Sequence, residues 1–504
     1  MPDSNLHKRI SELETQNQEL LVENKRLREM LGLPEEKISY KDENSPSLNF
    51  IEEGSIPTSS INKHRPPEEK IDLFMCLFRG RTDVYAKRCY SKKHDSSYYI
   101  PACRNEWVKG LCDRTRIKCK DCKHRNLLPL TAEVIDKHLR NKDENGAGIV
   151  GVYPLLADET CFFLAVDFDE EKWERDVATF RSVCENLNIP IAIERSRSSN
   201  GAHAWLFFDE AIPAISVRKL GNALLTKAMS FRAEIQFSSY DRMFPNQDFM
   251  PKGGFGNLIA LPLQGGARRN GNSEFVDEDF QNYPDQWAYL ASIRKMNQDE
   301  MNSLLAELCI GNGLGELGDL KEEDENIKPW EKKGVEFLES KDFPNGLTVV
   351  EANRLYINKE GVSPKALDRI KRLSAFQNPQ FYKTQKMRMS TYGIPRIIWS
   401  LDETDKYIGI PRGCKSSLIH LLEGSNVEYV FEDKRNKGRQ IDIRFKGSLR
   451  EEQQSATDTL LRYENGILSV PTAFGKTVVG ASLIAERKCN TLILVHLLFY
   501  LHGI

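Results

Sequence analysis

Apolar residues recur at seven-residue spacing at the start of the chain. Leu6, Leu13, Leu20 and Leu27 form one series, and Ile10, Asn17, Asn24 and Leu31 form a second series between them. Leucine in one seam and asparagine in the other are typical of a parallel two-stranded coiled coil. We therefore predict a coiled coil over residues 1–34 and a homodimer. The alternative is a single amphipathic helix that packs on its own domain.

The hydrophobic pattern divides the rest of the chain. Prolines, serines and charged residues without an apolar period indicate linkers, whereas apolar strands alternating with polar helices indicate a folded α+β core. We expect a multidomain α+β protein. The predicted divisions are a linker at 35–68, a zinc-binding module at 69–130, a catalytic domain at 131–300, a linker at 301–345, a region without a chemical motif at 346–448 and an ATP-binding segment at 449–504.

Composition narrows the class of protein. The 504 residues carry a formal net charge of -2, with 29% charged side chains, which excludes a uniformly basic nucleic-acid coat but allows local basic patches. No stretch approaches the ~20 apolar residues that cross a bilayer, and the N-terminus lacks a signal-peptide core. We expect a cytoplasmic protein with no membrane partner.

In the stretch FFLAVDFDEEKW, Phe162 to Trp173, an apolar predicted strand ends in acidic residues. Side chains alternate along a strand, so Asp167 and Asp169 are expected on one face and Phe168 in the core. Two neighbouring carboxylates repel each other unless a cation lies between them. Hard Mg²⁺ or Mn²⁺ suits such oxygen ligands and serves nucleotidyl transfer. The alternative is an acidic strand end without a metal.

The stretch IAIERSRSSNGAHAWLFF, Ile191 to Phe208, reads as a strand, a loop and a second strand. Arginines, hydroxyls and exposed loop amides are what a triphosphate requires. His203 stands at the loop exit, where it could donate to a phosphate oxygen. A β-hairpin with a merely packed histidine is the alternative. The candidate phosphate ligands here are Arg195, Arg197, Ser199 and Gly201.

A later stretch, from Ser238 to Gln264, offers further polar groups. Asp241 could supply a third metal carboxylate, and Asp248 is a rival for that position. Lys252 next to a glycine pair, and Arg268 soon after it, could approach a phosphate or a template.

These blocks together resemble the archaeo-eukaryotic primase superfamily. The fuller wording AVDFDEEKW, SRSSNGAHAWLFF, YDRMFPNQD and GGFGNLIALPLQ is similar to the primase domain of TOTE conflict systems over about residues 69–300. The resemblance implies a catalytic sheet like that of an RNA-recognition motif, which makes or extends strands from nucleoside triphosphates. It implies metals on Asp167, Asp169 and Asp241, and a phosphate contact from His203.

Four cysteines lie within twenty residues. Cys103, Cys112, Cys119 and Cys122 have the number and part of the spacing of a closed structural zinc site, with His94 and His124 as spare ligands. Seven Lys or Arg against two Asp between Lys109 and Arg125 favour contact with a phosphate backbone. The alternative is a redox pair or free cysteines.

The stretch GILSVPTAFGKTVVG, Gly466 to Gly480, reads as a strand, a phosphate loop and a helix. Backbone amides, a lysine and a hydroxyl would hold phosphates and magnesium there. The loop has Val470 where the general pattern has glycine, and it resembles motif I of superfamily-two helicases. The candidate ATP ligands are Gln453, Thr472, Gly475, Lys476 and Thr477. The acidic motif and second domain of such helicases are not found, so we expect a truncated, incomplete RecA-like domain.

Three functions are compatible with these patterns. The first is a DNA primase-polymerase that uses Mg²⁺ or Mn²⁺, Zn²⁺ and nucleoside triphosphates, on DNA with or without an RNA primer. The second is a DNA-binding and dimerisation protein without catalysis. The third is an ATP-dependent helicase. The acids and His203 favour the first, and the sequence leaves the choice between ribonucleotides and deoxynucleotides open.

Overall fold

The computed structural model describes residues 61–91, 94–114, 116–141, 148–309 and 338–494. The predicted coiled coil lies outside the described residues, as do most of both predicted linkers, so dimerisation through it stays a prediction. The described part of the chain is mixed α+β. No helix in that part combines the length and the apolar character that a bilayer span requires.

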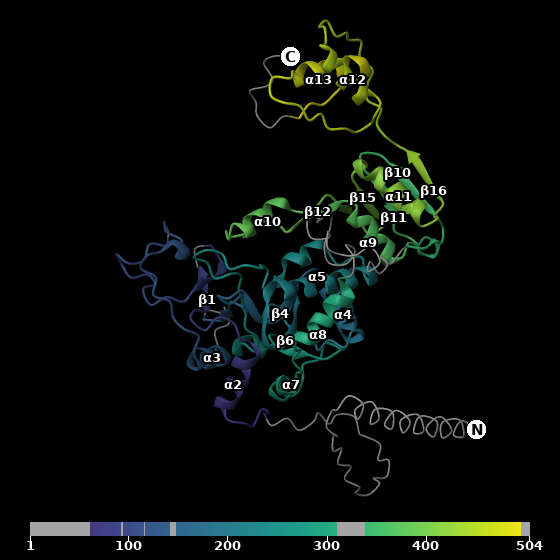
Figure 1. The fold of residues 1–504 in the computed structure, drawn as a ribbon. Coiled ribbons are helices and arrows are strands. Elements are labelled where there is room, and N and C mark those ends of the chain that lie inside the picture. Colours follow the sequence, from purple (N-terminus) through teal and green to yellow (C-terminus); the bar gives the residue numbers. More distant parts are fainter. Residues whose placement is uncertain (1–60, 92–93, 115, 142–147, 310–337, 495–504) are drawn as a thin grey trace, which may run out of the picture. The chain divides into compact units, whose positions relative to one another are not determined.

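A five-stranded antiparallel sheet contains the strand that ends in Asp167 (Figure 1). Residues from Cys161 to Val166 are all buried in this strand, because both faces of the sheet are covered. The strand order is β7 (Met243–Phe244), β4 (Thr160–Phe168), β6 (Ala202–Pro213), β5 (Ala192–Arg195) and β9 (Phe275–Val276).

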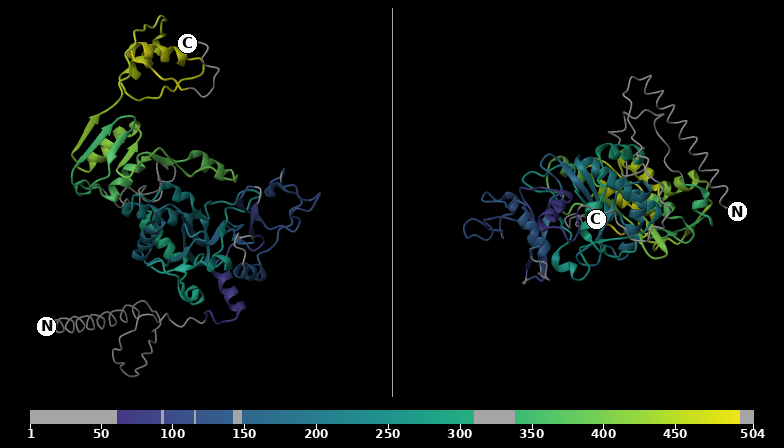
Figure 2. Two further views of the ribbon diagram at one scale, coloured as in Figure 1. Left: turned by 180° about the vertical axis from the view of Figure 1, so that it is seen from behind. Right: turned by 90° about the horizontal axis from the view of Figure 1, so that it is seen from below.

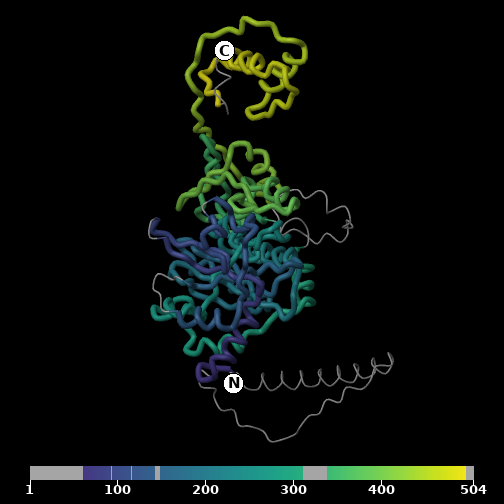
Figure 3. Tube along the Cα trace, turned by 90° about the vertical axis from the view of Figure 1, so that its left-hand side faces the viewer, coloured from purple at the N-terminus to yellow at the C-terminus, as the bar shows by residue number. Residues whose placement is uncertain are grey.

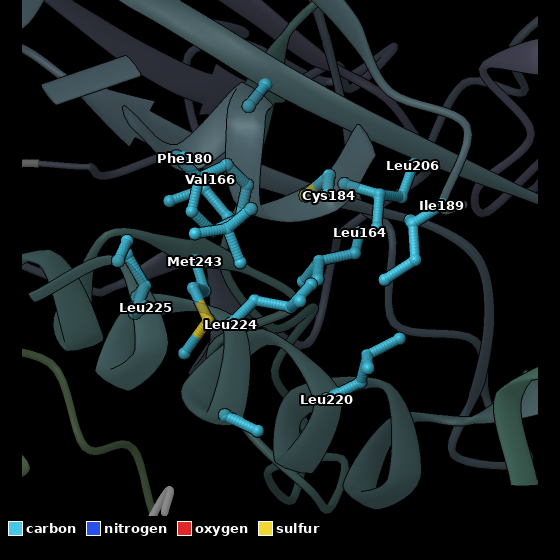
Figure 4. Close-up of a cluster of buried hydrophobic side chains, with 14 of the residues drawn as sticks. Leu164, Val166, Phe180, Cys184, Ile189, Leu206, Leu220, Leu224, Leu225 and Met243 are labelled. Carbon is cyan, nitrogen blue, oxygen red and sulfur yellow. The ribbon is translucent and has the colours of Figure 1, made fainter. Parts of the chain in front are cut away.

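Two long helices, α4 (Trp173–Asn186) and α5 (Ala214–Phe231), cover one face of this sheet. Leu164 and Val166 of β4 point toward them and pack with Phe180 and Leu224 (Figure 4). Each such side chain contributes roughly 1.5–3 kcal/mol when it is fully buried. A third helix, α8 (Gln298–Leu308), packs beside α5.

The opposite face of the sheet packs on N-terminal elements. Phe78, which follows α2 (Pro67–Leu77), lies edge-on to Trp205 with ring centroids 5.0 Å apart. The helices α3 (Ala132–Arg140) and α7 (Gln286–Ser292) complete this layer. Figure 3 shows the purple and blue N-terminal segment within the same body as the teal segment.

A second sheet combines strands from the predicted zinc-binding module, residues 69–130, with strands from the predicted catalytic domain, residues 131–300. Its strand order is β2 (Ser96–Pro101), β1 (Ala86–Ser91), β3 (Val150–Val152) and β8 (Ile259–Ala260). Strands from both sides of residue 130 therefore belong to one sheet. The boundary predicted there falls inside a continuous structure rather than at a linker.

Residues 338–433 form a further sheet with α9 (Pro364–Arg372) and α11 (Lys415–Gly424) packed on it (Figure 2). Its strand order is β14 (Asp402–Glu403), β15 (Tyr407–Ile410), β11 (Leu355–Asn358), β10 (Leu347–Glu351) and β16 (Tyr429–Asp433). β12 (Ala375–Gln377) and β13 (Ile397–Trp399) form a two-stranded antiparallel ribbon, and α10 (Pro379–Lys386) lies between them in the sequence.

The last described segment contains α12 (Glu451–Leu461) and α13 (Lys476–Arg487). The strand predicted at the start of the stretch from Gly466 is not formed in the described residues, and Ile467 is 93% exposed. A strand needs a partner to satisfy its backbone groups, and the described residues supply none beside this segment. The short elements of the chain are α6 (Gly265–Arg268), η1 (Cys119–Asp121), η2 (Phe237–Asp241), η5 (Ser340–Asp342) and η6 (Arg412–Cys414).

His138 of α3 is buried where α3 meets the second sheet. Its Nδ1 accepts a hydrogen bond from the Val150 amide at 3.1 Å, so Nε2 carries the proton and donates to the Pro262 carbonyl at 2.9 Å. Burial lowers the pKa of His138 to about 4, although the hydrogen bond to Pro262 opposes this effect. The neutral imidazole therefore links α3 to β3 and to Pro262, which follows β8.

Acid should weaken the contribution of the His138 hydrogen bonds to stability. The unfolded chain binds a proton at His138 near pH 6.5 and the folded chain only near pH 4, so the free energy of unfolding should fall as the pH falls through this window. The loss should reach about 3 kcal/mol. Glutamine keeps one donor and one acceptor but does not titrate. Chemical denaturation from pH 7 to pH 4 should therefore show a smaller loss in His138→Gln, and parallel losses in the two proteins would contradict this account.

Candidate active site

Three polar side chains lie in a row across three neighbouring strands. Asp167 of β4 pairs with His203 of β6, and His203 pairs on its other side with Glu194 of β5. Paired residues of antiparallel strands point to the same face, so the three side chains share the face opposite α4 and α5. Phe168 is buried on the helical face, as the alternation predicts.

His203 is held by carboxylates on both sides. Its Nδ1 lies 2.8 Å from Glu194 Oε2, and its Nε2 lies 3.7 Å from Asp167 Oδ1. Burial by itself lowers the pKa of His203, but the charge and hydrogen bond of Glu194 and the charge of Asp167 outweigh it and raise the pKa to about 9. The imidazole is therefore a cation near pH 7, with a proton at both ring nitrogens.

Glu194 is only 2% exposed and accepts from three groups. Besides His203, the Trp205 indole donates to Oε2 at 3.2 Å and the Ser273 hydroxyl donates to Oε1 at 3.3 Å. Our sequence reasoning missed this residue. The available signal was a glutamate inside the apolar strand IAIE, since a buried charge requires partners.

Asp169 lies just beyond the end of β4 and is half-exposed. It forms an ion pair with Arg242, whose guanidinium also lies 3.2 Å from Glu170. The Asp167 amide donates to the Arg242 carbonyl at 2.9 Å, so Arg242 continues the pairing of β7 with β4. Sequence reasoning missed Arg242, which directly follows Asp241.

Asp241 is the last residue of η2 and has a different neighbour. The Arg396 amide donates to both of its carboxylate oxygens, at 3.0 and 3.3 Å. Burial raises the pKa of Asp241, and the amide and charge of Arg396 oppose this. The β4–β7 register places Arg242, not Asp241, opposite Asp167. The structure thus brings Asp167 and His203 together but does not place Asp241 beside them.

Among the described residues, no three His, Cys, Asp or Glu side chains are arranged to hold a metal ion. The rival acid, Asp248, pairs with the buried guanidinium of Arg218 and accepts from Gln385 at 2.7 Å. Asp248 is therefore occupied by contacts within the protein. The hard oxygen donors of Asp167 and Asp169, two residues apart at a strand end, fit Mg²⁺ or Mn²⁺ in kind.

The loop between β5 and β6 passes close to the aspartate strand. A Cβ atom on Gly201 would lie 2.5 Å from the Phe168 carbonyl oxygen, so only glycine permits this approach. Ser199 has a positive φ of 70° and is exposed, and Arg197 is half-buried. The close approach of Gly201 places the loop backbone beside the end of β4.

Two of the predicted phosphate ligands have partners within the fold. Arg195 donates to the carbonyls of Phe280 and Gly271, and Arg268 pairs with Glu274 at 2.9 Å. Lys252 is exposed in the turn that precedes Gly253. The fold therefore engages Arg195 and Arg268, which leaves Arg197 and Lys252 as the remaining predicted cations.

The second sheet adds charge on the same side. Burial raises the pKa of Tyr99 in β2, while Arg88 and Arg197 lower it and Glu194 raises it. Arg88 of β1, Arg197 and Glu194 thus all lie within electrostatic range of Tyr99. Sequence reasoning did not single out Arg88.

The four clustered cysteines line one cavity of about 550 Å³, together with His124. His94 is not among the residues that line it. Burial raises the pKa of Cys119, Arg114 lowers it, and the other three thiols raise it further. The four sulfurs are therefore near enough to interact, although the described side chains are not arranged as a closed metal site.

The loop before α13 has the backbone of an anion site without β-strand support. Ala473 and Gly475 have positive φ values of 68° and 93°, and Gly475 caps the helix. The Lys476 ammonium donates to the Pro471 carbonyl at 3.1 Å, and the Gln453 amide donates to the Phe474 carbonyl at 2.7 Å. Thr472 and Thr477 are exposed.

Three comparisons relate the chain to known proteins, and the family match agrees with the resemblance in the sequence. Among solved structures, the polymerase domain from Mycobacterium tuberculosis ligase D in complex with DNA is 13% identical, with a TM-score of 0.24, covering 48% of this chain and 88% of that chain. None of the curated proteins matches the chain. Residues 69–304 match the family described as "TOTE conflict system, Archaeo-Eukaryotic Primase domain", and this segment is therefore similar to such primase domains.

Proposed function

We propose that residues 69–304 catalyse metal-dependent nucleotidyl transfer, as a DNA primase-polymerase. The observation that carries the proposal is the row of Asp167 and His203 on adjacent strands, inside the segment that matches the primase family. A carboxylate that can hold a divalent ion and an imidazolium that can hold a phosphate are the two groups that this chemistry requires side by side.

Each residue has a role in this proposal. Asp167 and Asp169 would hold Mg²⁺ or Mn²⁺, which neutralises the attacking and leaving oxygens when bound. His203 donates from Nε2 to a phosphate oxygen, and Arg197 and Lys252 attract the triphosphate. Gly201 lets the loop amides approach the same phosphates. Arg195 and Arg268 stabilise the segment from Gly265 to Phe280, because Arg195 donates to the Phe280 carbonyl and Arg268 pairs with Glu274.

Asp241 remains our candidate for the third carboxylate. Its oxygens accept from the Arg396 amide, so joining the other two acids requires release of this contact. The ion pair of Arg242 with Asp169 would likewise open, because the guanidinium and a metal ion compete for the same carboxylate.

We also propose that the cysteine module holds a structural zinc ion and touches single-stranded DNA. Four thiols around one cavity suit a closed tetrahedral site. Beside them, Arg114 lies 5.2 Å from the Trp107 ring and 5.9 Å from the Tyr98 ring. Trp107 is 61% exposed, and seven cations lie between Lys109 and Arg125. Aromatic rings among cations are typical of surfaces on which bases stack.

The loop before α13 supports a separate proposal, that residues 450–487 bind the phosphates of a nucleotide. Two positive-φ residues and a helix start form a concave set of backbone donors, and Lys476 adds a cation. The contact of Gln453 with the loop couples α12 to it. Strand unwinding is not part of this proposal.

Loss of the metal carboxylate should abolish synthesis. Primer extension with Mg²⁺ or Mn²⁺ should fall by at least about 100-fold in Asp167→Asn, because a ligand contributes more than the outer-shell partners, which cost 10–100-fold. Asp209→Asn removes an exposed acid at the far end of β6 and should leave extension unchanged. Equal activity of wild type and Asp167→Asn, measured in de novo priming and in extension, would refute the polymerase proposal.

Removal of two cysteines should release zinc. Wild type should contain about one zinc per chain by elemental analysis, and a chelator should lower its melting temperature. Cys119→Ser with Cys122→Ser should contain little zinc, whereas Cys414→Ser, a thiol outside the cavity, should match wild type. Full zinc content in the double variant would refute the site.

Trp107 should contribute stacking rather than charge. Trp107→Ala should weaken binding of a single-stranded oligonucleotide by about 1–3 kcal/mol with an unchanged salt slope, whereas Arg116→Ala should reduce the slope. Phe231→Ala, which removes an aromatic ring of equal exposure outside the module, is the control. Fluorescence anisotropy over a salt series measures both effects, and a loss equal to that of the control would contradict the surface.

A further inference from the structure

Glu194 is a buried carboxylate for which neither the sequence pattern nor the proposed chemistry has assigned a role. It is 2% exposed and belongs to a strand whose neighbours Ala192 and Ile193 are also buried. A carboxylate at such a position destabilises a fold unless it is well paired. Its three donors come from β6 and from the segment before β9, so it is the point at which two elements meet.

Two contacts fix the imidazole of His203, a hydrogen bond at Nδ1 and a packing contact with the Trp205 ring. Glu194 Oε2 accepts from Nδ1 at 2.8 Å, and the Trp205 ring stands nearly perpendicular to the imidazole at 78°, with the centroids 6.0 Å apart. The same oxygen accepts from the Trp205 indole. One carboxylate oxygen therefore sets the positions of both rings, and rotation of the imidazole would break a charge-assisted hydrogen bond.

The other imidazole nitrogen is directed at the candidate metal acid without bonding to it. Nε2 lies 3.7 Å from Asp167 Oδ1, which is longer than a hydrogen bond. Nε2 therefore faces Asp167 near the end of β4, where the loop at Gly201 passes. A phosphate oxygen bound between the loop and Asp167 would lie beside this nitrogen.

We propose that Glu194 is a positioning residue for nucleotide binding, because it holds His203 with Nε2 directed at the triphosphate. The inference rests on the proposed function and adds a residue to it. Ser273 extends the arrangement, since its hydroxyl donates to the second carboxylate oxygen while its amide donates to the Arg195 carbonyl at 2.9 Å. Glu194 thereby links His203 to the loop that Arg195 supports.

This role differs from a merely structural one in its dependence on His203. If Glu194 acts through the imidazole, removing it should matter only while the imidazole is present. If it only stabilises the sheet, its loss should add to the loss of His203, because independent contributions are additive.

A double-mutant cycle with Glu194→Gln and His203→Ala tests this dependence. Glutamine keeps an acceptor oxygen for Nδ1 but gives a weaker, uncharged hydrogen bond. Single-nucleotide incorporation should show a KM for the nucleotide raised about 3- to 10-fold, with kcat changed less, since the lost interaction already forms in the ground state. In the His203→Ala background, Glu194→Gln should leave KM unchanged. Equal effects in both backgrounds, or an effect on kcat alone, would overturn the inference.

Glu194→Leu provides the larger change, since it keeps the volume and removes every acceptor. We expect KM to rise more than in Glu194→Gln, provided that circular dichroism shows a folded protein. If this variant does not fold, the glutamine cycle alone decides the question, because Glu194→Gln retains the acceptor and its folding is checked in the same way.

A binding measurement separates this inference from the proposed function. Titration of dATP or ATP with Mn²⁺ reports the affinity for the nucleotide without requiring synthesis. The titration uses a Lys476→Ala chain, because this substitution removes the cation of the loop before α13 and so excludes binding there. A wild-type chain that does not incorporate nucleotides refutes the polymerase proposal. The positioning inference then stands if Glu194→Gln weakens binding only when His203 is present, and it fails if the two losses add.

Discussion

The pairing of β4 with β6 is the constraint on which the site depends. It sets Asp167 opposite His203, and the next pairing sets His203 opposite Glu194. Register has a period of two, so a slip of one residue would turn all of these side chains to the helical face. The apolar residues on either side prevent this slip, because Leu164 and Val166 are buried under α4 and α5 while Phe163 packs on the opposite layer.

Burial and neighbouring charge together set the pKa values of His138 and His203. A lone histidine at this depth would be neutral, as His138 is, whose pKa falls to about 4. His203 lies between two carboxylates, and its pKa rises to about 9 instead. His138 is fully buried and bonded by a backbone amide and a carbonyl, whereas the His203 side chain is 15% exposed and lies between acids. The neighbouring carboxylates therefore outweigh burial at His203.

The candidate metal acids are held apart by contacts within the protein. Asp169 is paired with Arg242, and Asp241 accepts from the Arg396 amide, which belongs to the segment between α10 and β13. Carboxylates that repel one another are thus each given a positive or hydrogen-bonding neighbour. Part of residues 346–448, in which the sequence showed no chemical motif, thus contacts Asp241, the candidate for the third carboxylate.

The sequence determined the local features of this protein. Alternation and composition were enough to place the buried strand that ends in acid, the glycine loop, the strand that carries His203 and the four cysteines, and the family match covers residues 69–304. Gly201 is required by a close approach that a loop glycine already suggests. The strand predicted before the loop of Gly475 shows the limit, because an apolar run becomes a strand only beside a partner.

Tertiary structure decided which polar groups meet. Arg195 and Arg268 look like phosphate ligands in the sequence, but the fold uses them to bind carbonyls and a glutamate. Glu194 and Arg242 look like ordinary strand and loop residues, but pairing between strands brings them to the acids and to His203. Periodicity fixes which face a residue occupies, whereas its partner depends on strand order and register, which join segments far apart in the chain.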